Sequence, residues 1–146
     1  MAPPTPLPKY VYKIVPTAPP SPIPAQYPLS ELDQKDGFVH LSIATQVSIG
    51  SHPFGTLATH VPLTWLVLFV KIPITAGLFF KDSTALWILK IRFKPEFHGA
   101  TTWEVQGCPH LYGNFGADDV EETKQFSRAE DETWSDAIER QSGFLV

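Results

Sequence analysis

Histidine, serine and carboxylate side chains stand in this sequence at spacings that could support ligand binding or catalysis. His40 and Ser42 are two residues apart, so in an extended strand an imidazole and a hydroxyl share one face. Together they can bind a ribose or a phosphate-bearing ligand. The alternative for His40 is an ordinary, partly buried histidine with no ligand.

A second group follows at Cys108, His110 and Tyr112, which also share a face if that segment is extended. Thiol catalysis by Cys108 is disfavoured, because side chains two apart on a strand are about 6–7 Å apart and a nucleophile must reach its base. Glu104 is the only carboxylate in the apolar segment 101–105. It is either a buried acid with a role or an edge-strand glutamate that faces water.

Extended segments are expected to position these residues. Alternation and β-branched or aromatic content predict strands at 10–15, near a sheet edge, and at 38–42, 86–93 and 101–105, with an extended segment from 109 to 113. Ser30 caps a predicted helical turn, with Asp33 three residues on. Trp134 and Ile138 indicate a short amphipathic helix over 131–141.

Length and composition indicate one globular domain. The chain has 146 residues, 43% hydrophobic and 18% charged. We expect a proline-rich N-terminal tail at 1–9, a domain at 10–120 and an acidic C-terminal tail with a short helix at 121–146. The net charge of -4 predicts neither a nucleic-acid nor a membrane partner. A single cysteine, no signal-peptide core and no Cys/His metal spacing favour a cytoplasmic protein without a metal.

The order of several short blocks resembles a known family, the domain-of-unknown-function family 952. The blocks are Tyr12-Lys13-Ile14-Val15, Asp36-Gly37-Phe38-Val39-His40-Leu41-Ser42, Ala44-Thr45-Gln46-Val47, Phe79-Phe80, Trp103-Glu104 and Pro109-His110-Leu111-Tyr112-Gly113. The resemblance covers about residues 10–120. It implies an α+β fold similar to the ADP-ribosylation fold, a small mixed split β-sheet with flanking helices around a cleft for a nicotinamide dinucleotide.

The same resemblance implies roles for the site residues, with NAD as the substrate. His40 and Ser42 would hold the nicotinamide-side ribose and carboxamide. Glu104 would support the ribose 2′-hydroxyl and stabilise the cation that develops as nicotinamide leaves. His110 would close the site with Tyr112, the nearest counterpart of the family's stacking tyrosine.

Two departures from the family pattern are Ile43 in place of a threonine and a proline loop in place of a tryptophan-bearing helix after Pro16. We therefore keep two alternatives open: acid–base catalysis on a small metabolite by His40, His110 and Glu104, and a non-catalytic binding or accessory protein. A small-molecule ligand is expected in the first, while a protein partner of the second is not identified by the sequence.

Residues 47–71 interrupt the family pattern with an apolar stretch. Val47-Ser48 can be encoded as GTAAGT, a splice-donor consensus, and Lys71 as AAG, which ends in the acceptor dinucleotide. The 25 codons between these limits keep the reading frame. We interpret 47–71 as a retained intron, the alternative being a genuine apolar insertion that lines a pocket or a subunit interface.

Overall fold

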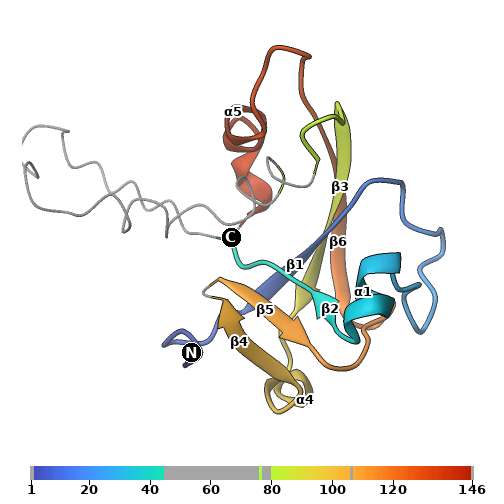
Figure 1. The fold of residues 1–146 in the computed structure, drawn as a ribbon, viewed down its shortest axis with the longest axis vertical. Coiled ribbons are helices and arrows are strands. Elements are labelled where there is room, and N and C mark those ends of the chain that lie inside the picture. The colour runs from blue at the N-terminus through green and yellow to red at the C-terminus, as the bar shows by residue number, and fades with distance from the viewer. Residues whose placement is uncertain (1, 45–75, 77–79, 106, 146) are drawn as a thin grey trace, which may run out of the picture.

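The computed structural model describes residues 2–44, 76, 80–105 and 107–145, and in these residues it contains two small antiparallel sheets (Figure 1). One sheet has the order β1-β3-β6 and the other β2-β5-β4. The strands are β1 (Tyr10–Val15), β2 (Val39–His40), β3 (Ala85–Arg92), β4 (Thr101–Val105), β5 (Cys108–Leu111) and β6 (Val120–Ser127). The helices are α1 (Glu31–Asp36), α4 (Pro95–His98), α5 (Trp134–Glu139) and the 3₁₀ turn η2 (Ser142–Phe144).

The α+β class is confirmed, as are the strands expected at 10–15 and 101–105, to the residue. The edge position of β1 within its sheet is confirmed too. The expected mixture of parallel and antiparallel strands is corrected, because every strand pair in the described residues is antiparallel. For β4 and β5 the reason is local: the chain reverses within two residues, and Gly107 has φ 75° there.

The C-terminal part of the chain holds more structure than a tail with a helix. Residues 120–127 form β6, which pairs with β3 with one register shift between Lys90 and Ile91. The sequence conceals this strand because only Phe126 among its side chains is fully buried, while its other positions carry mostly polar or charged residues. Helix α5 is shorter than the expected 131–141. It begins after Thr133, whose side chain accepts a hydrogen bond from the Asp136 backbone N–H.

The core consists of two apolar layers on either side of the β1-β3-β6 sheet. On one face Leu86, Ile88 and Phe126 pack against Trp134 and Ile138 of α5. The other face meets the inner face of the β2-β5-β4 sheet, where the buried side chains are Val11, Leu89, Ile91, Val39, Leu41, Trp103 and Leu111. The β1-β3-β6 sheet is therefore covered on both faces, while the β2-β5-β4 sheet turns its second face outward.

Residues 39–43 join the two sheets. Leu41 N–H and Ile43 N–H donate to the carbonyls of Pro109 and Gly107, which extends the pairing with β5. Between them Ser42 exchanges both backbone hydrogen bonds with Tyr12 of β1, at 2.7 and 2.9 Å. Of the predicted 38–42 strand, residues 39–42 are confirmed as extended chain, whereas Phe38 is a bend. Only Val39–His40 is regular strand, because Ser42 bonds to the other sheet.

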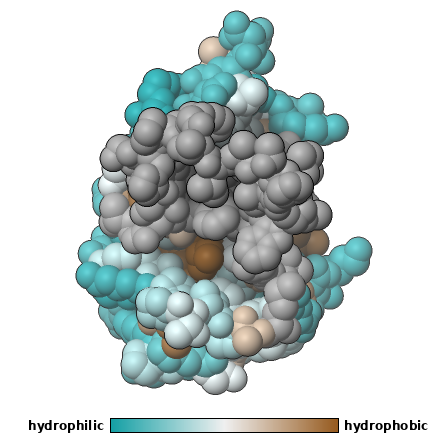
Figure 2. Space-filling view, turned by 90° about the vertical axis from the view of Figure 1, so that its left-hand side faces the viewer, coloured by the Kyte–Doolittle hydropathy of each residue, from teal (hydrophilic) through white to brown (hydrophobic). Residues whose placement is uncertain are grey.

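On the side of the molecule seen in Figure 2, the surface of the described residues is largely hydrophilic, with an apolar spot near its centre. Within the described part of the chain, no helix has the length and apolar character needed to cross a membrane. The insertion 47–71, and with it the choice between retained intron and genuine insertion, lies outside the described residues.

Candidate functional site

The outward face of the β2-β5-β4 sheet carries two histidines side by side. His40 of β2 is the register partner of His110 of β5, and His110 is in turn the partner of Thr102 of β4. The two imidazole rings are 5.5 Å apart between centroids. Around them lie Phe38, Tyr112 and Glu104. We call these five residues, Phe38, His40, Glu104, His110 and Tyr112, the polar face.

The imidazole of His40 lies between two carboxylates of helix α1. Its Nδ1 is 2.8 Å from Asp33 Oδ1, and its Nε2 is 3.1 Å from Asp36 Oδ2. The helix brings both acids to this place because Ser30 caps its start and Gly37, in the left-handed conformation with φ 79°, ends it directly before the strand. A neutral imidazole donates through only one nitrogen, so the two contacts together fit a doubly protonated ring.

Asp33 is itself held by Lys13 of β1, although the two residues belong to different layers. Lys13 Nζ is 2.6 Å from Asp33 Oδ2, and the side chains are 7% and 1% exposed. Burial alone would raise the pKa of Asp33, but the hydrogen bonds from Lys13 and from the His40 backbone N–H lower it to about 2. Burial lowers the pKa of Lys13, against the opposing effect of Asp33. The result is a buried carboxylate that stays ionised and accepts from His40.

His110 has a different environment. Its ring stacks on Phe38 at 4.2 Å and 17°, and its Nδ1 is buried without a hydrogen-bond partner among the described residues. Glu104 Oε2 is 3.7 Å from this atom, which is too long for a hydrogen bond and makes an ion pair only with a protonated His110. Burial and the neighbouring His40 lower the pKa of His110, while Glu104 and Asp36 oppose the shift. The lowered pKa favours an uncharged His110 at neutral pH.

The remaining predicted residues divide between the polar face and its surroundings. The side chain of Glu104 is 61% exposed, which agrees with the alternative of a glutamate that faces water. Its Oε2 is nevertheless 3.7 Å from His110 Nδ1. Tyr112 is 48% exposed, and its ring is 5.2 Å from that of Phe38. Ser42 is only 3% exposed and serves the bridge to β1. Cys108 alternates with Pro109 and Leu111 on β5, in line with the predicted shared face of Cys108, His110 and Tyr112.

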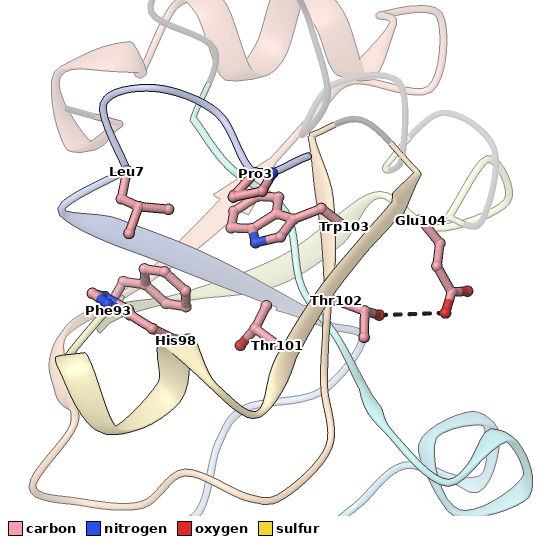
Figure 3. A pocket seen from close by; sticks show the side chains of 8 residues that line it. All are labelled: Pro3, Leu7, Phe93, His98, Thr101, Thr102, Trp103 and Glu104. Atoms are coloured by element: carbon pink, nitrogen blue, oxygen red, sulfur yellow. Dashed lines mark hydrogen bonds between the residues drawn. The ribbon is translucent and has the colours of Figure 1, made fainter. Parts of the chain in front are cut away.

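A cavity of about 470 Å³ lies on the other side of β4 and is lined by Pro3, Leu7, Phe93, His98, Thr101, Thr102, Trp103 and Glu104. In Figure 3 Trp103 and Thr101 point toward Leu7 and Phe93, whereas Thr102 and Glu104 point away from them. Alternation along a strand produces this division. The cavity shares Glu104 with the polar face, but His40 and His110 do not line it, so we place the candidate site at the polar face.

Four residues of this arrangement were missed by sequence reasoning as site residues: Lys13, Asp33, Asp36 and Phe38. One signal was present, because Lys13 is the only charged residue in the apolar strand at 10–15, and a buried charge needs a partner. The partner itself could not be read from the sequence, since Asp33 is 20 residues away. In the described residues, no three His, Cys, Asp or Glu side chains are grouped as metal ligands.

Comparison with known proteins gives one family and one solved fold. The sequence model of the family "Protein of unknown function (DUF952)" matches residues 23–123, which include both histidines of the polar face. A crystal structure of protein CC0527 from Caulobacter crescentus is similar at 21% identity, with a TM-score of 0.56, covering 85% of this chain and 91% of that one. A double mutant of CC0527 gives the same values. No curated protein matches the sequence.

Proposed function

The chain belongs to the DUF952 family of proteins of unknown function, and from its polar face we propose that it binds the nicotinamide riboside part of NAD and cleaves the glycosidic bond. The observation that carries the proposal is the row His40, His110 and Glu104 on one outward sheet face, flanked by Phe38 and Tyr112. Such a combination of aromatic rings with a few convergent polar groups is typical of small-molecule sites.

Each part of the ligand has a matching group. The exposed ring of Tyr112, beside Phe38, offers a surface on which a planar nicotinamide ring can stack. The imidazoles and the Glu104 carboxylate can hydrogen-bond ribose hydroxyls. Among the described residues the only lysine or arginine in contact with these groups is Lys13, which is buried against Asp33. Because no exposed lysine or arginine of the described residues contacts these side chains, we assign the riboside and not the phosphates to this face.

The chemistry follows from the charges. In the proposed reaction the C1′–N1 bond breaks, nicotinamide leaves as a neutral molecule with the bonding electron pair, and Glu104 stabilises the oxocarbenium-like ribose. Water then forms the new bond to C1′, and its proton passes to the uncharged His110. An acceptor hydroxyl or amine in place of water makes the same step an ADP-ribosyl transfer.

Thermal shift and calorimetry on the full chain test the proposal with NAD, nicotinamide mononucleotide, nicotinamide riboside and ADP-ribose. A ligand at 100 times its dissociation constant adds about 2.7 kcal/mol to stability, a shift of several degrees. We expect the first three ligands to bind and ADP-ribose to bind more weakly. His40→Ala and Glu104→Gln should abolish nicotinamide release, measured by chromatography, while the matched control Glu122→Gln on β6 should not.

Two results would overturn it. One is a folded protein that none of the nicotinamide ligands stabilises, which leaves the non-catalytic alternative. The other is equal stabilisation by ADP-ribose, which would show that nicotinamide is not recognised.

A second candidate function is acid–base catalysis on a small metabolite. It is favoured by the contrast between the two histidines: His40 is held between Asp33 and Asp36, while burial lowers the pKa of His110. A histidine held between two carboxylates can act as the acid, and a histidine with a lowered pKa can act as the base. Turnover of a metabolite without NAD, lost in both His40→Ala and His110→Ala, distinguishes this candidate from the first.

A further inference from the structure

Asp33 contacts His40 both at its backbone N–H and at the ring nitrogen Nδ1. We infer that Asp33, oriented by Lys13, is a positioning residue that keeps the proton on Nδ1 of His40 and thereby presents Nε2 to the ligand. The inference rests on the proposed function, because it names what prepares the same site.

The two carboxylate oxygens of Asp33 contact different groups. Oδ1 accepts from the His40 backbone N–H at 3.0 Å and faces His40 Nδ1 at 2.8 Å. Oδ2 accepts from Lys13 Nζ at 2.6 Å, and the same ammonium also donates to the His40 carbonyl at 3.2 Å. His40 is therefore fixed at its backbone N–H, its carbonyl and its ring by one buried ion pair.

These contacts fix the tautomer of the neutral ring. An ionised carboxylate only accepts hydrogen bonds, so the nitrogens that face Asp33 and Asp36 both favour a hydrogen. When the ring is neutral and carries one proton, the buried Asp33, held in place by Lys13, keeps that proton on Nδ1 and the lone pair is on Nε2. That nitrogen is beside Asp36, whose side chain is one-third exposed. A ligand hydroxyl that displaces Asp36 can then donate a hydrogen bond to Nε2 of His40.

The substitution Asp33→Asn tests this logic because an amide has one accepting oxygen. Lys13 Nζ lies closest and donates to this side chain, so it takes the amide oxygen and leaves the NH₂ group facing Nδ1 and the His40 backbone N–H, which loses its acceptor. The NH₂ group can donate only to an unprotonated Nδ1, and the proton of His40 moves to Nε2. Removing the ammonium as well, in Lys13→Met with Asp33→Asn, frees the amide oxygen to turn back to His40.

The experiment is ¹⁵N NMR of the full chain at a pH at which the ¹⁵N chemical shifts show a neutral His40 ring, with the His40 signals assigned through His40→Ala. We expect the Nδ1–H tautomer in the wild type, the Nε2–H tautomer in Asp33→Asn and the Nδ1–H tautomer again in the double variant. Riboside affinity should fall about 10-fold or more in Asp33→Asn and recover in the double variant.

The outcomes separate the two proposals. An Nε2–H tautomer in the wild type overturns the positioning role, and this measurement needs no variant to fold. Unchanged tautomers across folded variants overturn it as well. If the tautomers change as expected but no nicotinamide ligand binds any variant, Asp33 still orients His40 and the proposed substrate is wrong.

Discussion

The two sheets of this protein differ in what their faces meet. The β1-β3-β6 sheet has apolar side chains on both faces, and its central strand β3 is buried at Leu86, Ile88, Leu89, Lys90 and Ile91. The β2-β5-β4 sheet is shorter, buries one face and presents two histidines and a carboxylate on the other. The larger core therefore lies around the first sheet and the proposed site on the second, with the Lys13–Asp33 ion pair crossing between them.

Truncating one phenylalanine to alanine beside each sheet should give the largest difference in stability. Phe126→Ala in β6 removes a fully buried ring that packs in the α5 layer, and it should lower the free energy of unfolding by about 4 kcal/mol. Phe38→Ala on the polar face loses mainly ring stacking with His110, about 1 kcal/mol, but should abolish ligand binding. Urea denaturation measures both, and equal losses would contradict the division between the sheets.

Breaking the ion pair between the sheets should have the next largest effect. Lys13→Met leaves the carboxylate of Asp33 buried without its cation, which costs about 3 kcal/mol. The double variant with Asp33→Asn removes both charges and should recover most of that stability. If the single and double variants were equally unstable in urea, the loss would come from packing of the Lys13 side chain and not from the unpaired charge.

The contrast between the sheets also describes what the sequence could predict. The strands at 10–15 and 101–105 were predictable because their apolar alternation is local, and the capped start of α1 at Ser30 was equally local. Strand β6 was not, because its one fully buried residue, Phe126, owes its burial to β3 and α5. At the site, His40 and His110 were predictable by residue type, but the contacts of Asp33 depend on how α1 packs against β1.

Acid should destabilise the wild-type fold more than the fold of a variant that lacks the Lys13–Asp33 ion pair. The pKa of Asp33 is about 2 in the folded protein against an ordinary value of 3.8, so ionised Asp33 stabilises the fold above that ordinary value. The stabilisation, about 2 kcal/mol, is lost as the pH falls from 3.8 toward 2. Melting temperatures over this range should fall more steeply for the wild type than for the Lys13→Met, Asp33→Asn double variant, and parallel curves would contradict the prediction.

Asp36→Asn should have a smaller effect, at the outer side of the polar face. The side chain of Asp36 lies against Nε2 of His40 and would compete with a ligand for it. The variant should therefore bind nicotinamide riboside about threefold more tightly, because a partly exposed ion pair contributes about that much to the equilibrium. Because the carboxylate of Asp36 raises the pKa of His110, its loss should also lower that pKa. An NMR titration of His110 checks this without ligand, and an unchanged titration would contradict the prediction.

Deleting residues 47–71 should have the smallest effect of all. If the segment is a retained intron, the remaining chain is the natural protein. The strand pairs of both sheets, the Lys13–Asp33 ion pair and the ring contacts of His40 and His110 are all made by residues outside it. The shortened chain should therefore melt no lower than the full one and keep the Nδ1–H tautomer of His40. Transcript sequencing checks the gene itself: reads that join the codons of Gln46 and Ile72 are expected, whereas a shortened chain that fails to fold would establish 47–71 as a genuine insertion on which both sheets depend.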